Sequence, residues 1–241
     1  MALPKIDVPT YDIELPISKK QIRYRPFLVK EQRNLLMAME SDDTNSVHSA
    51  IRDILYNCTL TENVDVEKLP IVDVEYYFLN IRAKSVGEVV ESRYRCNNIV
   101  EDKECGNIME KPINLLTVTV DTKNQVDPEI KITDKLTVKM KYPEFGIIKD
   151  SIELDNDTEI TFHLLAQCVE YIYDGDQFYY GSETPLQEMV EFVENLNQES
   201  FEKLEEYFNS LPKLKEKIEM TCSKCSFHHS IDVEGLESFF A

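Results

Sequence analysis

The chain has 241 residues, enough for one large domain or two small ones, and 42% of them are hydrophobic. Its 45 acidic and 26 basic residues give a formal net charge of -19, which disfavours binding to nucleic acid or to anionic membranes. Basic or neutral proteins are the expected partners, although acidity also serves solubility alone. The apolar stretches are too short to span a bilayer, and no signal-peptide-like run opens the chain. We therefore expect a reducing cytoplasm, where the six cysteines are metal ligands or core thiols rather than disulfides.

The first part of the chain predicts a β-hairpin followed by helices. Residues 12–15 and 21–25 alternate polar and apolar side chains around Pro16. Apolar residues then recur at helical spacing over residues 28–39, 47–58 and 70–81. The third of these runs starts at Pro70, and proline is favoured in the first turn of a helix.

The rest of the chain predicts strands, then helices, then strands. Strands are expected over residues 88–95, over the return from Ile108 to Val120, and over 130–140. Apolar positions four apart predict a helix from Ile160 to Ile172. Thr184-Pro185-Leu186-Gln187 reads as a capping box, and Asn197 as the cap of a further helix. Strands are expected up to Cys222 and near residues 231–233, before an amphipathic tail over 236–240.

This order of elements predicts an α+β fold with a mostly helical body. We expect an N-terminal hairpin and helices in residues 1–87. Residues 88–142 and 212–241 would together form a β module resembling a zinc ribbon, and residues 143–211 would form an inserted helical region.

Four cysteines define that module. Cys96 and Cys105 form one pair, Cys222 and Cys225 the other, and strand-like sequence flanks both pairs. Two strand–turn–strand knuckles that each supply two thiolates predict one structural Zn²⁺ ion, because a closed four-ligand site is structural rather than catalytic. The first pair is unusually widely spaced, with an expanded loop over residues 98–104, and Gly106 suits a tight turn. Uncharged thiols or a disulfide are the alternatives.

Two histidines lie close to the second cysteine pair. His228 or His229 could replace one of the cysteine ligands, although projection from a strand suits both better. The remaining cysteines, Cys58 and Cys168, lie on apolar faces and are interpreted as small buried hydrophobes.

No catalytic constellation is present, since the sequence has no nucleophile elbow, phosphate-binding loop or dinucleotide fingerprint. We therefore expect a protein without enzymatic activity. An acidic, aromatic-rich loop contains Tyr173, Phe178, Tyr179 and Tyr180. These side chains either pack onto the domain or form a docking site for a partner, since tyrosines supply contact area at low entropic cost.

Several stretches taken together resemble a known family. They are Pro9-Thr10-Tyr11, the segment from Tyr24 to Glu31, Leu36 to Glu40, Lys84 to Glu88, Met140 to Pro143, and the ending from Cys222 to Phe240. The chain resembles the baseplate hub subunit or hub assembly family of contractile-tailed bacteriophages of the T-even type. In this family the paired cysteines form ribbon-like knuckles, which correspond here to Cys96, Cys105, Cys222 and Cys225.

The resemblance implies a role in building the hub of the tail baseplate in the cytoplasm of the infected bacterium. We expect a chaperone-like assembly factor that binds other hub proteins or the tape-measure protein. A permanent hub subunit in the virion is the first alternative. A zinc-ribbon protein that binds nucleic acid is the second, and the net charge of -19 argues against it. The oligomeric state stays open.

Overall fold

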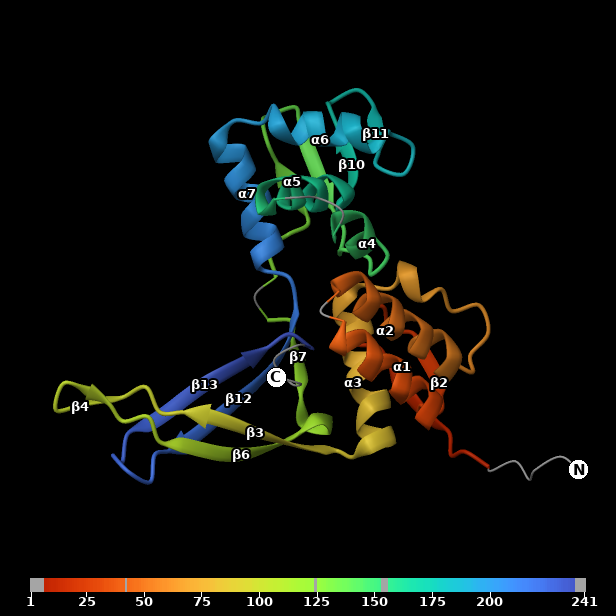
Figure 1. Cartoon of the computed structure of the whole chain (residues 1–241). Helices are drawn as coiled ribbons and strands as arrows, with labels where there is room; N and C mark the ends of the chain where they lie inside the picture. Colours follow the sequence, from red (N-terminus) through yellow and green to blue (C-terminus); the bar gives the residue numbers. More distant parts are fainter. Residues whose placement is uncertain (1–6, 42, 124, 153–155, 237–241) are drawn as a thin grey trace, which may run out of the picture.

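The computed structural model describes residues 7–41, 43–123, 125–152 and 156–236, and it mixes helices and strands (Figure 1). Every strand pair in the described residues is antiparallel. An α+β composition was expected, and a doubly wound parallel sheet is excluded for this part of the chain. None of the described helices is long and apolar enough to cross a membrane.

The N-terminal part packs a β-hairpin against helices, as predicted. Its elements are β1 (Tyr11–Glu14), β2 (Gln21–Tyr24), α1 (Val29–Glu40), α2 (Thr44–Cys58), the short 3-10 helix η1 (Val66–Lys68) and α3 (Ile71–Val86). Leu15, Leu55 and Tyr77 are fully buried in its core. The equally buried Asp73 of α3 accepts hydrogen bonds from the backbone N–H groups of Ile17 and Ser18, both at 2.8 Å. Because these bonds satisfy the buried carboxylate, they tie the β1–β2 turn to α3.

Two long hairpins and one further strand form the part that carries the four cysteines. These elements are β3 (Val89–Arg95), β6 (Ile108–Asn114), β7 (Thr119–Asp121), β12 (Lys213–Thr221) and β13 (His228–Glu234). β3 pairs with β6, while β12 lies between β13 and β7. Leu79 of α3 packs with Leu115, Leu214 and Ile218, so these strands share a core with the N-terminal part.

The predicted return strand from Ile108 to Val120 is interrupted. Leu115–Thr117 forms a 3-10 turn, η2, between β6 and β7. The side chain of Asn114 accepts a hydrogen bond from the Leu116 N–H at 3.0 Å, which caps this turn and ends β6.

The remaining elements form a four-stranded sheet with helices packed against it. The sheet order is β11-β10-β9-β8. The elements are β8 (Glu129–Lys131), β9 (Thr137–Met140), β10 (Val169–Tyr173), β11 (Phe178–Tyr180), α4 (Ile147–Ile152), α5 (Asp157–Gln167), α6 (Leu186–Glu194) and α7 (Gln198–Asn209). In Figure 1 this sheet and its helices lie at the opposite end of the molecule from the β3–β6 hairpin.

Two predictions for this part were wrong. The helix does not continue to Ile172, because α5 ends at Gln167, with Cys168 as its C-cap, and β10 pairs with β9 as a strand. The strands expected within 130–140 are present as β8 and β9 of this sheet. The capping box at Thr184 is absent, since Pro185 occupies the cap position and the Thr184 hydroxyl donates to the Tyr180 carbonyl at 3.0 Å.

The cap at Asn197 is confirmed, because its side chain accepts a hydrogen bond from the Ser200 N–H at 2.9 Å. The predicted tail over 236–240 lies outside the described residues except for Leu236.

Candidate metal centre

The first cysteine knuckle connects β3 to β6. Cys96 comes directly after β3, and the backbone N–H of Gly106 donates to the Cys96 carbonyl at 3.0 Å. Gly106 has φ +63°, a conformation that favours glycine, as the sequence indicated. The expanded loop is itself a small hairpin, formed by β4 (Ile99–Val100) and β5 (Lys103–Glu104). This inserted hairpin explains the wide spacing between the first two cysteines, because the pairing of β4 with β5 returns Cys105 to a position beside Cys96. The Cys105 N–H donates to the Asn98 carbonyl at 2.8 Å.

The second knuckle joins β12 to β13. The Cys222 N–H donates to the Phe227 carbonyl at 2.8 Å, and the Ser226 N–H donates to the Cys222 carbonyl at 2.9 Å. Ser226 takes φ +58°, a left-handed conformation that is uncommon for a residue with a side chain. This tight turn places Cys225 on the same side as Cys222, so both thiols face the first knuckle.

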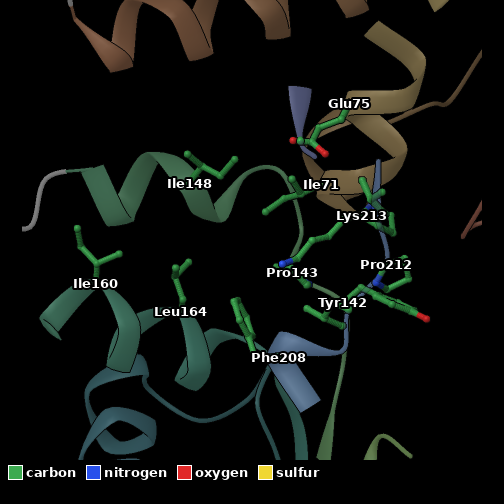
Figure 2. Close-up of a pocket in the computed structure, with 14 residues that line it drawn as sticks. Ile71, Glu75, Tyr142, Pro143, Ile148, Ile160, Leu164, Phe208, Pro212 and Lys213 are labelled. Carbon is green, nitrogen blue, oxygen red and sulfur yellow. The ribbon is translucent and has the colours of Figure 1, made fainter. Parts of the chain in front are cut away.

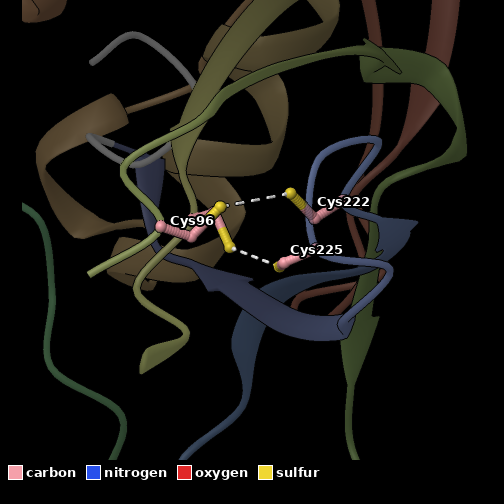
Figure 3. Close-up of side chains that lie close together, drawn as sticks. Cys96, Cys222 and Cys225 are labelled. Atoms are coloured by element: carbon pink, nitrogen blue, oxygen red, sulfur yellow. Dashed lines mark hydrogen bonds between the residues drawn. The ribbon is translucent and has the colours of Figure 1, made fainter. Parts of the chain in front are cut away.

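The two knuckles meet, and the four thiols converge. All four Sγ atoms lie within 4.8 Å of one another. Sulfurs of different knuckles lie 3.6 Å apart for Cys96 and Cys225 (Figure 3) and 3.8 Å apart for Cys105 and Cys222. Four thiolates about 2.3 Å from a tetrahedral Zn²⁺ ion are themselves roughly 3.8 Å apart, whereas a disulfide needs about 2.05 Å. The arrangement therefore fits a four-coordinate metal ion, and all six cysteines are free thiols.

Nitrogen atoms surround the sulfur cluster. The buried His229 places Nε2 3.2 Å from the Cys96 sulfur. The side-chain amides of Asn98 and Asn107 donate to the sulfurs of Cys225 and Cys222, both at 3.5 Å. Donors of this kind stabilise negatively charged thiolates around a metal ion. The two asparagines were not predicted, because their only signal in the sequence is a position within two residues of a cysteine.

Neither histidine belongs to the four-sulfur group. His229 contacts the Cys96 sulfur, and His228 is exposed beside the Thr221 hydroxyl at 3.3 Å. The register of β12 with β13 explains the difference, because His228 and His229 are consecutive on β13 and so point to opposite faces.

The thiols differ in acidity without a metal ion. Hydrogen bonds from backbone N–H groups, with that of Cys225 first, lower the pKa of Cys222 to about 6. Burial raises the pKa of Cys96 to about 12. A divalent cation among four sulfurs favours the thiolate form of every ligand, so it would offset the desolvation that keeps Cys96 protonated.

Cys58 and Cys168 lie apart from this cluster. Both are fully buried, and burial raises the pKa of Cys58 to about 11 and that of Cys168 to about 12. Thiols with such raised pKa values are poor nucleophiles and poor metal ligands. Their interpretation as small buried hydrophobes agrees with the structure.

The aromatic segment is a hairpin rather than a loop. β10 pairs with β11 so that Tyr171 faces Tyr180 and Tyr173 faces Phe178. These four rings lie on one face, and the centroids of Tyr173 and Phe178 are 4.6 Å apart. Phe178 is 49% exposed and Tyr180 is 45% exposed, so the rings form an open aromatic surface at the edge of the sheet.

The register separates one predicted residue from the others. Tyr179 pairs with the buried Ile172 and so belongs to the opposite face, where its hydroxyl donates to Asp174 at 3.0 Å. Tyr171, which is half-buried, lies on the same face as Phe178 and Tyr180 instead. Its hydroxyl donates to Glu129 at 2.8 Å, and the Lys139 ammonium lies 5.5 Å from its ring centroid.

Comparison with known proteins gives one match. Neither the curated proteins nor the solved structures contain a match to this chain. The family model described as "T4 bacteriophage base plate protein" matches residues 8–241, which is nearly the whole chain and includes both knuckles and the aromatic hairpin. The chain therefore belongs to the baseplate proteins of T4-type bacteriophages.

Proposed function

We propose that this baseplate protein is a non-enzymatic assembly factor of the baseplate hub, which holds other hub proteins or the tape-measure protein in an assembly-competent state. Membership in the baseplate family supports interaction with other baseplate proteins. The choice of an assembly factor rests mainly on one observation, the open aromatic surface formed by Tyr171, Tyr173, Phe178 and Tyr180. Clustered exposed aromatic rings are typical of protein-binding surfaces.

The charge near this surface indicates the chemistry of the partner. Asp174 and Asp176 lie in the turn between β10 and β11, and Glu129 lies beside Tyr171. Aromatic faces next to carboxylates suit arginine side chains, which can stack on a ring and pair with an acid at the same time. The net charge of -19 would also attract a basic partner over longer distances. We therefore expect the bound segment of the hub or tape-measure protein to be basic.

In this proposal the metal ion is zinc and its role is structural. The four cysteines provide a closed set of ligands with no open position for a substrate. Zinc bound there would hold the two knuckles together as a zinc-ribbon-like module. The division into residues 1–87, the cysteine module and an inserted helical region stays a prediction.

Affinity capture from infected cells tests the partner. Tagged protein should retain hub or tape-measure proteins, and Phe178→Ser combined with Tyr180→Ser should reduce this retention at least tenfold. Tyr56→Ser is the matched control, because Tyr56 of α2 is similarly exposed at 42% but lies on a different module. Retention that is unchanged in the double variant, or that includes neither protein class, would refute the proposal.

A permanent structural subunit is the second candidate, which the family's description as a base plate protein favours. Quantitative mass spectrometry of purified virions separates the two. An assembly factor is depleted from virions relative to its abundance in infected cells, whereas a subunit is present in a fixed ratio to the other baseplate proteins.

A further inference from the structure

The helix α1 presents an apolar face to solvent. It packs against α2, and on its inner side the buried Glu31 pairs with Arg25 at 3.1 Å. On the opposite side the exposed fraction is 80% for Val29, 52% for Leu36 and 61% for Met37. Residues three, four, seven or eight positions apart share one face of a helix, so these three side chains form a single stripe along α1. Such a concentration of exposed apolar side chains on one helix face is typical of a contact surface.

Two charged side chains lie on the same stripe. Arg33 and Glu40 are seven positions apart, about two turns of the helix, and both are exposed. Neither has an ion-pair partner in the part of the chain that the structure describes. The stripe therefore has a free guanidinium on one side of Leu36 and Met37 and a free carboxylate on the other.

This arrangement is complementary to itself. Arg33 and Glu40 are equally far along the helix from the point between Leu36 and Met37. A two-fold axis through that point would set a second α1 antiparallel to the first. Arg33 of each copy would then face Glu40 of the other, and Leu36 of each would face Met37 of the other. Contacts related by a two-fold axis are the commonest in soluble homo-oligomers.

The distribution of charge also favours a contact between two copies at this face. The chain has a net charge of -19, so most faces of two copies repel one another. Residues 28–40 are an exception, because their two basic residues, Lys30 and Arg33, balance the two acidic residues, Glu31 and Glu40. The repulsion between charges outside this face falls off over about 8 Å at physiological salt.

The shape of the face suits such a contact. A helix face is convex and can pack against an identical helix. The open apolar cleft lined by Ile71, Ile160 and Phe208, shown in Figure 2, is concave, and a two-fold axis would set one hollow against another. The α1 face is about 18 Å long and about 10 Å wide, which offers less than the ~800 Å² per partner of a stable interface. A contact through α1 alone is therefore expected to be weak and reversible.

We propose that the exposed face of α1 is the interface of a homodimer in which two copies of this chain pack their α1 helices antiparallel. The contact has an apolar centre of Leu36 against Met37 and an ion pair between Arg33 and Glu40 on either side of it. This interface lies on α1, on a different part of the chain from the aromatic hairpin, and it does not depend on the proposed function.

Sedimentation equilibrium on the full chain, from micromolar to near-millimolar concentration, tests the interface. The unaltered chain should show a reversible monomer–dimer equilibrium. Arg33→Glu and Glu40→Arg each set like charges against one another at two places in the dimer, so each should raise the dissociation constant at least tenfold. Lys111→Glu is the matched control, because it makes the same change of net charge as Arg33→Glu at an exposed position of β6. This control should leave the dissociation constant unchanged.

A mixture of the two variants gives the decisive readout. When Arg33→Glu protein pairs with Glu40→Arg protein, each carboxylate on one stripe faces a guanidinium on the other. Association between the two variants, followed with a fluorescent label on one of them, should therefore recover to that of the unaltered chain. Recovery also shows that both variants fold. A chain that stays monomeric, a dimer that neither single reversal weakens, or a mixture that does not recover association would each overturn the proposal.

Discussion

Replacing Cys222 by serine tests whether the sulfur cluster is a metal site that stabilises the fold. The substitution exchanges a thiolate ligand for a hydroxyl at a position where the side chain is 1% exposed. A tetrahedral zinc ion that loses one of four thiolates is bound far more weakly. We expect one zinc ion per chain in the wild type, and less than a tenth of that in Cys222→Ser or Cys225→Ser.

The size of the stability loss follows from the chain segments that the metal connects. Cys105 and Cys222 are 117 positions apart in sequence, and the pairing of Asp121 with Lys213 that brings β7 and β12 together is lost on unfolding. A link between the two cysteines therefore closes a loop of 117 residues in the unfolded chain, for which chain entropy gives roughly 4.9 kcal/mol. In a chain of this size that corresponds to a fall in Tm of about 10–20 °C.

Elemental analysis and calorimetry measure both quantities on the same samples. Cys168→Ser is the matched control, because it makes the same chemical change at a fully buried cysteine outside the cluster. This control should lose stability but retain one zinc ion per chain. A chelator should lower the Tm of the wild type to that of Cys222→Ser and leave Cys222→Ser itself unchanged. Wild-type protein without zinc, or a Cys222→Ser variant with undiminished zinc and Tm, would refute the reasoning.

Three further predictions concern residues away from the cluster. Burial lowers the pKa of His48, which stacks on Phe145 with ring centroids 4.1 Å apart, so the folded state favours the neutral ring. The stability that the neutral ring contributes should therefore be fully present above about pH 6.5, the pKa of histidine in the unfolded chain, and should fall as the pH drops below this value. His48→Phe should flatten this pH dependence of the free energy of unfolding, measured in urea between about pH 7 and 5. Asp73→Asn places an amide donor against two backbone N–H groups of the β1–β2 turn, and should cost about 1–3 kcal/mol in urea unfolding. Gly181→Ala would put a methyl group 2.2 Å from the carbonyl oxygen of Val169, so it should cost about 1–3 kcal/mol and alter the near-ultraviolet circular dichroism of the aromatic hairpin.

Short-range patterns in the sequence determined much of the secondary structure of this protein. The N-terminal hairpin, α2 and α3 follow from hydrophobic periodicity, since each buries one face whose spacing is visible in the sequence. The same periodicity predicts α1, although Leu36 and Met39 of that helix are exposed. The cap at Asn197 follows from a bond between residues three positions apart. The two strand-flanked cysteine pairs were also predictable, because strand-like sequence lies on both sides of each pair, although the small hairpin inside the first pair was expected only as a loop.

Tertiary structure decided where these local elements meet. Residues 169–173 form a strand because β9 pairs with them, although the apolar spacing before them predicts a continuing helix. The register of β10 with β11 places Tyr179 on the opposite face from Phe178 and Tyr180 and adds Tyr171 to the face of those two rings. The convergence of four sulfurs within 4.8 Å depends on two hairpins that the intervening chain brings together. The amino-acid order therefore determined which residues could bind a metal ion, and long-range pairing and packing determined that their sulfurs lie close enough to do so.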